Sequence, residues 1–527
     1  MENNKISSEM WKIISEEAWR EAAREGTDVS CMRIMEKMSG MIAEKLGSQE
    51  TKAFVESIGV LVDYTEKDMG EDETALDAES EAVAVAKKTV RPIVEVKLQR
   101  RLDDLDRKQS GKMRCMHCGG KTLSQGRRKR PWRSLLGKLN LSRRYRCCGD
   151  CDKGQWPAQK DLGLPEEEFT ARFEEVCSLM ATTVPHEMAV KLLALLSGVE
   201  ISEKAVQDMV SRRAEKLEQR LEKQRQDYNP YEENGLPVET PRLPEDATES
   251  PPQLAYLEMD GVIPMTREEK PVSKLSQRDL EIQKEAKAQK VRGGKGRRYE
   301  LVGREVKNAV LYRGEDCAQE MPSRGCLLDK RYVSYLGDWK HFASLLWVEM
   351  LRQGFDKAKR LIILSDGADW IRSIAEWLPI EPLMILDLYH AKRRVWEMAR
   401  IHYGPKNSRG KKWAKKQCER IEQGKVTRVI ESLRFLRPRT EDAKDCIASL
   451  TTYFKNNLDR MDYPTYRLMG LRVGSGAVES ANYHLTGARL KLQGMRWSEQ
   501  GARDMAFLRA DLFNGQWENS TRAFLAA

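Results

Sequence analysis

The stretch that decides the fold is Tyr453–Trp497, YFKNNLDRMDYPTYRLMGLRVGSGAVESANYHLTGARLKLQGMRW. It places one carboxylate, Glu479, in the first turn of a helix predicted to open at Gly474-Ser475-Gly476. Two earlier carboxylates stand where a run of branched and aromatic residues ends and a glycine follows: Asp260 in LAYLEMDG and Asp366 in RLIILSDG. Such runs predict strands. The chain therefore carries two strand-end aspartates and one helix glutamate.

The three carboxylates suit divalent metal ions. Mg²⁺ prefers oxygen ligands, and the chain has only six histidines for any other kind of site. Two such ions about 3.5–4 Å apart can clamp the attacking and leaving oxygens of an in-line phosphoryl displacement. Taken singly, an aspartate before a glycine also serves as a turn cap. The order of strand Asp260, strand Asp366 and helix Glu479, 106 and 113 residues apart, favours a site for two Mg²⁺ or Mn²⁺ ions.

Further strands surround the two aspartates. YELVGREVKNAVLY (299–312) and LMILDLY (383–389) have the composition of strands, and helical patterns separate the later ones. Strands followed by alternating helices and strands predict an α/β layer fold with a mixed sheet. From Arg393 to about Arg467 the chain is helix-patterned and basic, which predicts a helical insertion.

Several stretches carry a family resemblance: LEMDGVIPMTREE (257–269), GREVKNAVLY (303–312), SDGADWI (365–371), ILDLYHAKRRVWEMA (385–399) and the closing block. From about residue 253 to Trp517 the chain resembles the DDE transposases of ISKra-type bacterial insertion sequences, relatives of Mutator-like and hAT-type elements. The resemblance implies a ribonuclease-H-like core with an all-helical insertion. It also implies that Asp260, Asp366 and Glu479 bind the catalytic metal ions.

Asp387-Leu-Tyr-His390 resembles the Asp/Cys-x-x-His motif of those relatives, where it lies near the catalytic carboxylates. Two interpretations stay open. Asp387 and His390 hold the start of the insertion or contact DNA near the scissile phosphate, or His390 only caps or packs its helix. We do not expect His390 to be a metal ligand.

Two Cys-x-x-Cys pairs, Cys115/Cys118 and Cys148/Cys151, are separated by 29 residues. Four thiolates so spaced predict a tetrahedral structural Zn²⁺ site of the ribbon type. Cys147 leaves the third ligand open between Cys147 and Cys148.

Residues 111–160 carry 14 Lys and Arg against two Asp, a net charge of +12 (14 − 2). Such a basic segment indicates a phosphate-contacting surface, although a solvated face is the alternative. A second candidate lies at 161–215, where a helix after Pro185, a turn at Gly198 and a helix after Ser202 outline a helix-turn-helix or a plain helical hairpin. The candidate DNA-binding residues are Arg127, Arg128, Lys129, Arg130, Arg143, Arg144, Arg212 and Arg213.

The composition, 40% hydrophobic and 33% charged, is that of a soluble protein of 527 residues, with no secretory signal or membrane helix expected. We expect a cytoplasmic bacterial protein. Asp63–Glu81, with nine acids and one lysine, reads as a mobile linker. We expect seven segments: a helical region at 1–110 that includes the acidic linker, a zinc ribbon at 111–160, a helix-turn-helix-like segment at 161–215, a linker at 216–252, the first part of the core at 253–394, a helical insertion at 395–467 and the second part of the core at 468–527.

These features together predict a transposase that binds terminal inverted repeats in double-stranded DNA, cleaves a strand and transfers the 3′-hydroxyl to a target. Pairing two element ends requires a homodimer or a larger assembly, and the N-terminal helices are candidates for that contact. The alternatives are a nuclease or resolvase of the same fold without strand transfer, and a domesticated DNA-binding protein.

Overall fold

A computed structural model describes residues 48–70, 72–109, 113–271, 273, 275–288, 299–321 and 324–526. The helices expected before Ser48 lie outside the described residues. The chain divides into two compact units, the first reaching Ala181 and including His186–Met209, the second made of Thr182–Pro185 and Val210–Ala527. Each unit is described by itself.

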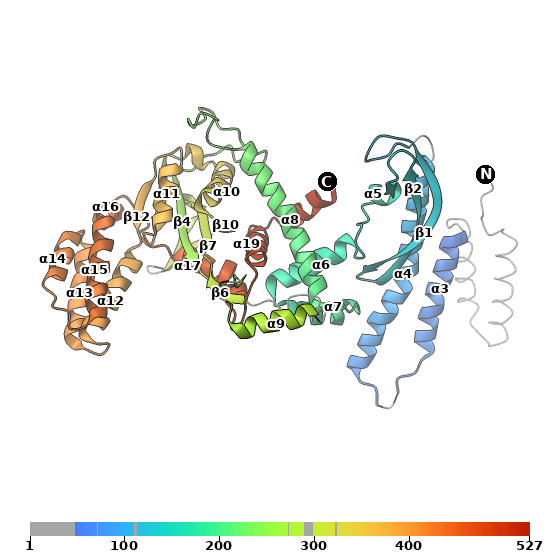
Figure 1. The fold of residues 1–527 in the computed structure, drawn as a ribbon, viewed down its shortest axis with the longest axis horizontal. Coiled ribbons are helices and arrows are strands. Elements are labelled where there is room, and N and C mark those ends of the chain that lie inside the picture. Colours follow the sequence, from blue (N-terminus) through green and yellow to red (C-terminus); the bar gives the residue numbers. More distant parts are fainter. Residues whose placement is uncertain are drawn as a thin grey trace. The chain divides into compact units, whose positions relative to one another are not determined.

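The first unit joins two long helices to a small antiparallel sheet and a group of helices (Figure 1). Its elements are α3 (Ser48–Glu66), α4 (Ala75–Lys108), β1 (Thr122–Ser134), β2 (Gly137–Cys148), β3 (Gly154–Gln155), α5 (Pro157–Asp161), α6 (Ala171–Thr183), α7 (His186–Ser197) and the start of α8 (Glu203–Asp227).

The ribbon predicted at 111–160 is present as the sheet β1-β2-β3. β1 and β2 form a hairpin with Ser134 opposite Gly137, where glycine takes a φ of 98°. The buried core of this region is Leu102 of α4, Trp132, Leu141 and Ala158. α4 thus packs against β2, and Arg127, Arg128 and Lys129 of β1 are exposed.

The structure differs from the expected acidic linker. Asp63–Glu66 belong to α3, and the acids from Asp77 onward belong to α4. Thr74 caps α4, and its side chain and that of Asp77 form a reciprocal capping box. Acids in a first turn stabilise a helix through its dipole, which explains why this charge run folds. The predicted linker at 216–252 is likewise helical up to Asp227, because α8 runs on beyond its predicted end.

The second unit is built around a five-stranded sheet in the order β10-β7-β4-β11-β12. β10, β7 and β4 are antiparallel neighbours, whereas β4, β11 and β12 are parallel. The strands are β4 (Leu254–Val262), β7 (Val306–Arg313), β10 (Arg331–Leu336), β11 (Arg360–Ser365) and β12 (Leu383–Leu386). The mixed sheet predicted from the sequence is therefore confirmed, with β4 at its centre.

Helices cover this sheet. α10 (Trp339–Arg352) and α19 (Glu499–Phe513) pack against β10, and α11 (Asp369–Trp377) packs against α10. A last helix, α20 (Trp517–Ala526), follows α19. Trp497, which precedes α19, is buried and donates its indole N–H to the carbonyl of Leu490, so it anchors this region as a packed side chain.

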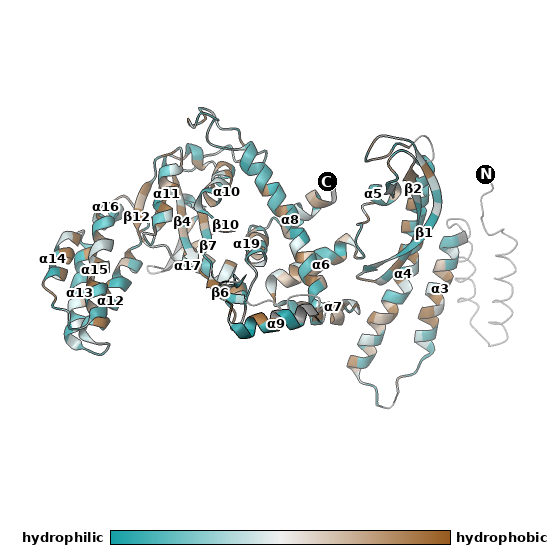
Figure 2. Ribbon diagram, viewed as in Figure 1, coloured by the Kyte–Doolittle hydropathy of each residue, from teal (hydrophilic) through white to brown (hydrophobic). Residues whose placement is uncertain are grey.

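The predicted helical insertion is present after β12. It consists of α12 (Leu388–Tyr403), α13 (Ser408–Glu422), α14 (Val426–Arg434), α15 (Glu441–Asn456) and α16 (Tyr463–Leu468). Hydrophilic (teal) and hydrophobic (brown) residues alternate along these helices in Figure 2, as expected for amphipathic helices that bury one face. Their buried residues, among them Val395, Ile421 and Phe454, share one core with strands β11 and β12.

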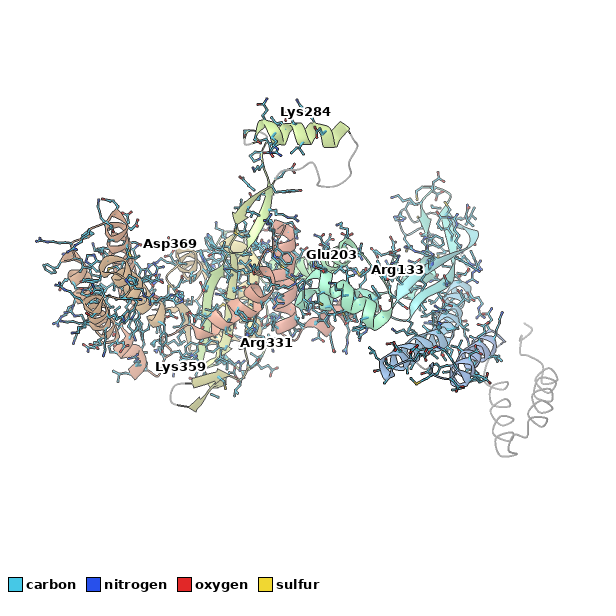
Figure 3. The ribbon with its side chains drawn as sticks, turned by 90° about the horizontal axis from the view of Figure 1, so that it is seen from below. Arg133, Glu203, Lys284, Arg331, Lys359 and Asp369 are labelled. Carbon is cyan, nitrogen blue, oxygen red and sulfur yellow. The ribbon has the colours of Figure 1, made fainter. Side chains whose placement is uncertain are left out.

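Two hairpins extend from the sheet. β5 (Met265–Glu269) pairs with β6 (Tyr299–Gly303), and the chain between them contains α9 (Gln277–Ala288). Figure 3 shows α9, marked by Lys284, at the far end of this hairpin. β8 (Cys317–Met321) pairs with β9 (Arg324–Leu327). Within the described part of the chain, no helix has the length and apolar character needed to cross a membrane.

Candidate active site and metal centre

Asp260 and Asp366 lie side by side on adjacent parallel strands, Asp260 within β4 and Asp366 directly after β11. In the register of β4 and β11, Met259 is opposite Ser365, so the next residues on each strand are the two aspartates. Burial raises the pKa of Asp260, and the nearby Asp366 carboxylate raises it further. Two acids at the carboxyl ends of neighbouring strands thus form a negatively charged, partly desolvated position, where a cation would be stabilised.

Glu479 comes from α17 (Gly476–Ala481), which packs across β4 and β7. Its Oε1 lies 2.9 Å from Nε2 of His390 on α12. Nη2 of Arg393 lies 3.0 Å from the same imidazole nitrogen. One nitrogen cannot serve both partners, since it donates to Glu479 when protonated and accepts from Arg393 when not. His390 therefore has two exclusive partners, one of which is a candidate metal ligand.

Two buried carboxylates fix where α17 begins. Glu258, two residues before Asp260 and fully buried, accepts hydrogen bonds from the Val478 backbone N–H (2.9 Å) and the Tyr312 hydroxyl (2.6 Å). Asp387 caps α12 by accepting from the His390 N–H (2.7 Å), and it also accepts from the Ser475 N–H (2.6 Å). The strand that carries Asp260 and the helix that carries His390 are thus both bonded to the first turn of α17.

The side-chain amides of two asparagines also support Asp260. The next segment, η6 (Asn482–Gly487), is a π-helix, and the side chain of Asn482 donates to Oδ2 of Asp260 at 2.7 Å. Asn308 of β7 donates to Asn482 (2.8 Å) and accepts from the hydroxyl of Ser334 on β10 (2.6 Å). Asp260, Asn308 and Ser334 are register partners across three strands. This chain of hydrogen bonds fixes the orientation of the Asp260 carboxylate. A π-turn in a helix frequently marks a functional site.

The oxygens of Asp260, Asp366 and Glu479 do not converge on one metal position in this structure. Among the described residues, the four cysteines alone form a group of three or more His, Cys, Asp or Glu side chains with ligand atoms within 4.8 Å of one another. Glu479 is held by His390, and its side chain is about half exposed at 53%. The donor set nevertheless fits a hard cation, because it consists of carboxylate oxygens from three elements beside a desolvated acid.

The cysteine cluster has the geometry of a metal centre. Sγ of Cys115 lies 3.7 Å from that of Cys151, and Sγ of Cys118 lies 3.5 Å from that of Cys148. The backbone N–H of His117 lowers the pKa of the Cys115 thiol to about 7, which favours the thiolate that zinc binds. Cys147 instead points its thiol toward backbone carbonyls, 3.5 Å from that of Asp152. The open choice between Cys147 and Cys148 is thereby resolved in favour of Cys148.

Two arginines that were expected to contact DNA, Arg143 and Arg213, are instead buried in the protein. Arg143 is buried, with its guanidinium 3.7 Å from the centre of the Trp156 ring, and burial lowers its pKa to about 10. Arg213 is buried on the Trp517 ring and donates to the Trp517 carbonyl (3.0 Å) and the Thr521 hydroxyl (2.9 Å). Neither Arg143 nor Arg213 is on the surface, so neither remains a candidate DNA contact.

The other basic candidates differ in their partners and exposure. Arg127 and Arg144 face Asp106 of α4, at 3.4 Å and 3.9 Å, and Arg130 donates to the Glu166 carbonyl. Arg212, on α8, is partly buried. Arg128 and Lys129, consecutive residues of β1, are exposed and are therefore the best-placed cations among the residues predicted from the sequence.

Three side chains that support the candidate site were not predicted from the sequence: Glu258, Asn308 and Asn482. Each lies inside a predicted strand or helix, where a polar residue is easily taken for a solvent-facing one. A period-two reading of LEMDG places Glu258 on the same face as Asp260, which is the one clue that the chain offers.

Residues 310–523 match the model of an uncharacterised protein family, UPF0236. The matched span includes Asp366, His390 and Glu479 and begins after Asp260. A UPF0236 protein of Caldanaerobacter subterraneus subsp. tengcongensis, whose name carries eleven gene designations, is 25% identical over 205 residues, or 37% of this chain. A second UPF0236 protein of that organism is 26% identical over 221 residues, or 40% of this chain. The chain spans 40 to 44% of the length of these relatives.

Proposed function

We propose that this chain is a DDE transposase of the ISKra type, acting on DNA through metal-dependent phosphoryl transfer. The observation that carries the proposal is the placement of Asp260 and Asp366 side by side on adjacent parallel strands, with Glu479 on a helix bonded to the same strand. Three antiparallel strands continued by two parallel ones, with the first strand central, support a ribonuclease-H-like core.

Asp260, Asp366 and Glu479 would hold two Mg²⁺ or Mn²⁺ ions. When bound, these ions supply charge neutralisation at the attacking and leaving oxygens of an in-line displacement. The residues of the chain position the oxygens. Asn482 holds the Asp260 carboxylate, and His390 orients Glu479 through its Oε1. Catalysis of this kind depends on placement and charge more than on a proton-transferring side chain.

The name of one similar protein supports the proposal that the gene for this chain belongs to a mobile element. A protein whose name carries eleven gene designations in one organism is encoded by several copies of its gene. Multiple copies are what a mobile element leaves behind. The exposed cations of the ribbon and the helices of the first unit would bind terminal inverted repeats, and at least two protomers would pair two element ends.

The test uses DNA from the ends of the element, taken from the sequence that flanks the gene. The purified protein with Mg²⁺ should nick this DNA and join its 3′ end to a second duplex. Asp260→Asn, Asp366→Asn and Glu479→Gln should each abolish nicking while binding stays intact, because each keeps the side-chain volume and removes the metal-binding charge. Asp369→Asn is the matched control, an exposed acid three residues from Asp366.

Nicking by any one of the three variants at the rate of the parent protein would remove that residue from the site. Nicking without joining would identify a nuclease or resolvase instead. Sequence-specific binding with no nicking under Mg²⁺ or Mn²⁺ would identify a DNA-binding protein that has lost its activity.

A further inference from the structure

One face of α12 forms a hollow of aromatic and cationic side chains beside the candidate site. The hollow has a volume of about 480 Å³ and is lined by Tyr389, Lys392, Arg393, Trp396 and Arg400. These positions recur at three, four, seven and eleven residues from the first, so they share one face of the helix. Figure 1 shows α12 within the helical block that follows β12. The hollow begins at the residue next to His390 and extends away from the carboxylates.

The ring of Tyr389 stands against the start of α17. A Cβ at Gly474 would lie 2.6 Å from Cε2 of this ring, so the absence of a side chain at Gly474 leaves room for the ring in this position. Tyr389 is nevertheless 65% exposed. A tyrosine so exposed does not belong to the core. Its aromatic ring lies next to the turn that presents Glu479 and is open to solvent.

Charge and burial both change along this face of α12. Trp396 is partly buried and packs against the core of the insertion, so it forms the inner wall. Lys392 pairs with Glu422 and lies 5.9 Å from the centre of the Tyr389 ring. Arg393 and Arg400 are exposed. Bases stack on aromatic rings while cations hold the backbone phosphates, which is how proteins bind single-stranded nucleic acid.

We propose that this hollow binds an unpaired nucleotide of the DNA substrate. Its base stacks on Tyr389 with Trp396 behind it, and its phosphates lie against Arg393 and Arg400. This inference rests on the proposed function, and it names the substrate more closely, as DNA whose strands are separated next to the cut. Double-stranded DNA offers no free base face to Tyr389, whereas every unpaired base does.

The test measures binding without cleavage. Fluorescence anisotropy of the full chain, without added Mg²⁺ or Mn²⁺ and without a chelator, compares a 20-nucleotide oligothymidylate, an abasic strand of equal length and charge, and a 20-base-pair duplex. The variants are Tyr389→Ala and Tyr389→Phe. Phe435→Ala is the matched control, since Phe435 is 84% exposed in the same helical block and outside the hollow.

Loss of one stacking ring should weaken oligothymidylate binding about 5- to 100-fold in Tyr389→Ala. Tyr389→Phe keeps the ring and should bind like the parent protein, as should Phe435→Ala. The abasic strand should bind the parent protein and Tyr389→Ala equally weakly. Unchanged oligothymidylate binding in Tyr389→Ala overturns the proposal, and so does an equal loss on the abasic strand or the duplex.

Glu479→Gln separates this proposal from the proposed function. It should bind oligothymidylate like the parent protein, because the hollow needs no metal ion. Failure of the parent protein to cleave, with base-dependent binding intact, would count against the transposase and leave the hollow standing. Cleavage with no effect of Tyr389→Ala on binding would do the reverse.

Discussion

The imidazole Nε2 of His390 lies 2.9 Å from Oε1 of Glu479 and joins the first helix of the insertion to the helix that crosses the sheet. The backbone N–H of His390 is itself fixed by Asp387, which also holds Ser475. The Asp387-Leu-Tyr-His390 segment therefore acts on Glu479 twice, through the imidazole and through the turn before α17. Of the two interpretations left open by the sequence, the structure favours one in which His390 does more than pack its helix.

His390→Ala should raise the Mg²⁺ concentration needed for half-maximal DNA cleavage by about 10- to 100-fold, the usual effect of losing a side chain that orients a metal ligand. His390→Gln retains a donor and should recover part of this loss. The measurement is cleavage rate against Mg²⁺ concentration, with His402→Ala on the same helix as control. An unchanged Mg²⁺ requirement in His390→Ala would return His390 to a packing role.

Glu258 should matter to stability through its two hydrogen bonds. Glu258→Ala leaves the Val478 N–H and the Tyr312 hydroxyl unsatisfied and opens a cavity, so it should cost about 2–4 kcal/mol of unfolding free energy. Glu258→Gln can accept from Val478 and donate to the Tyr312 oxygen, and it should cost less than about 1 kcal/mol. Urea unfolding of both variants measures this. Equal losses in the two would show that the negative charge of Glu258 is required.

Glu258 should also make the stability of the protein depend on pH. Burial raises the pKa of Glu258 above its ordinary value of 4.5, so the unfolded chain releases this proton at a lower pH than the folded protein. The stabilisation is complete below pH 4.5 and is lost as the pH rises through the folded pKa. Relative to Glu258→Gln, the parent protein should therefore lose stability on going upward from pH 4.5. Parallel stability curves for the two proteins across this range would contradict the prediction.

The sequence predicted where the strands lie because apolar runs are local signals, but it did not predict all of their ends: β4 continues through Asp260 to Val262, and β12 already ends at Leu386. LAYLEMD and RLIILSD lie on β4 and β11 as expected, and the cysteine spacing indicated the cluster that the structure contains. Strand order is not local. That Asp260 and Asp366 lie side by side follows from the parallel pairing of β4 with β11, which no single stretch encodes.

Burial of charged residues was the main thing that the sequence could not supply. Arg143 and Arg128 look alike in a basic run and are opposite each other on β2 and β1, yet Arg143 is buried between Trp132 and Trp156 whereas Arg128 is exposed. Glu258 and Asn308 were missed for the same reason, since a buried polar residue is recognised only by its partners. The acidic run at 63–81 misled in the other direction, because its two ends belong to α3 and α4 and Thr74 caps α4.

The cysteine cluster should hold one Zn²⁺ per chain. Cys148→Ser should lose the metal, whereas Cys147→Ser should retain it, because the thiol of Cys147 faces carbonyls outside the cluster. Metal binding supplies much of the folding free energy of so small a unit, so Cys148→Ser should also increase hydrogen exchange in the ribbon. Elemental analysis of protein purified without chelators gives the stoichiometry. Zinc retained in Cys148→Ser and lost in Cys147→Ser would move the ligand by one residue.

The exposed pair Arg128 and Lys129 should contribute to DNA binding through phosphate contacts alone. Each neutralised phosphate adds about 0.9 to the slope of log affinity against log salt concentration. Replacing both residues with glutamine should therefore reduce that slope by up to about 1.8, equally on repeat DNA and on random DNA. Lys97→Gln with Lys108→Gln removes the same charge from exposed positions of α4 and serves as control. A salt titration of the six protein–DNA combinations, three proteins on two DNAs, measures the slopes. An unchanged slope in the Arg128 and Lys129 variant would make this part of β1 a solvated surface and would shift the search for DNA contacts to the basic helices of the insertion.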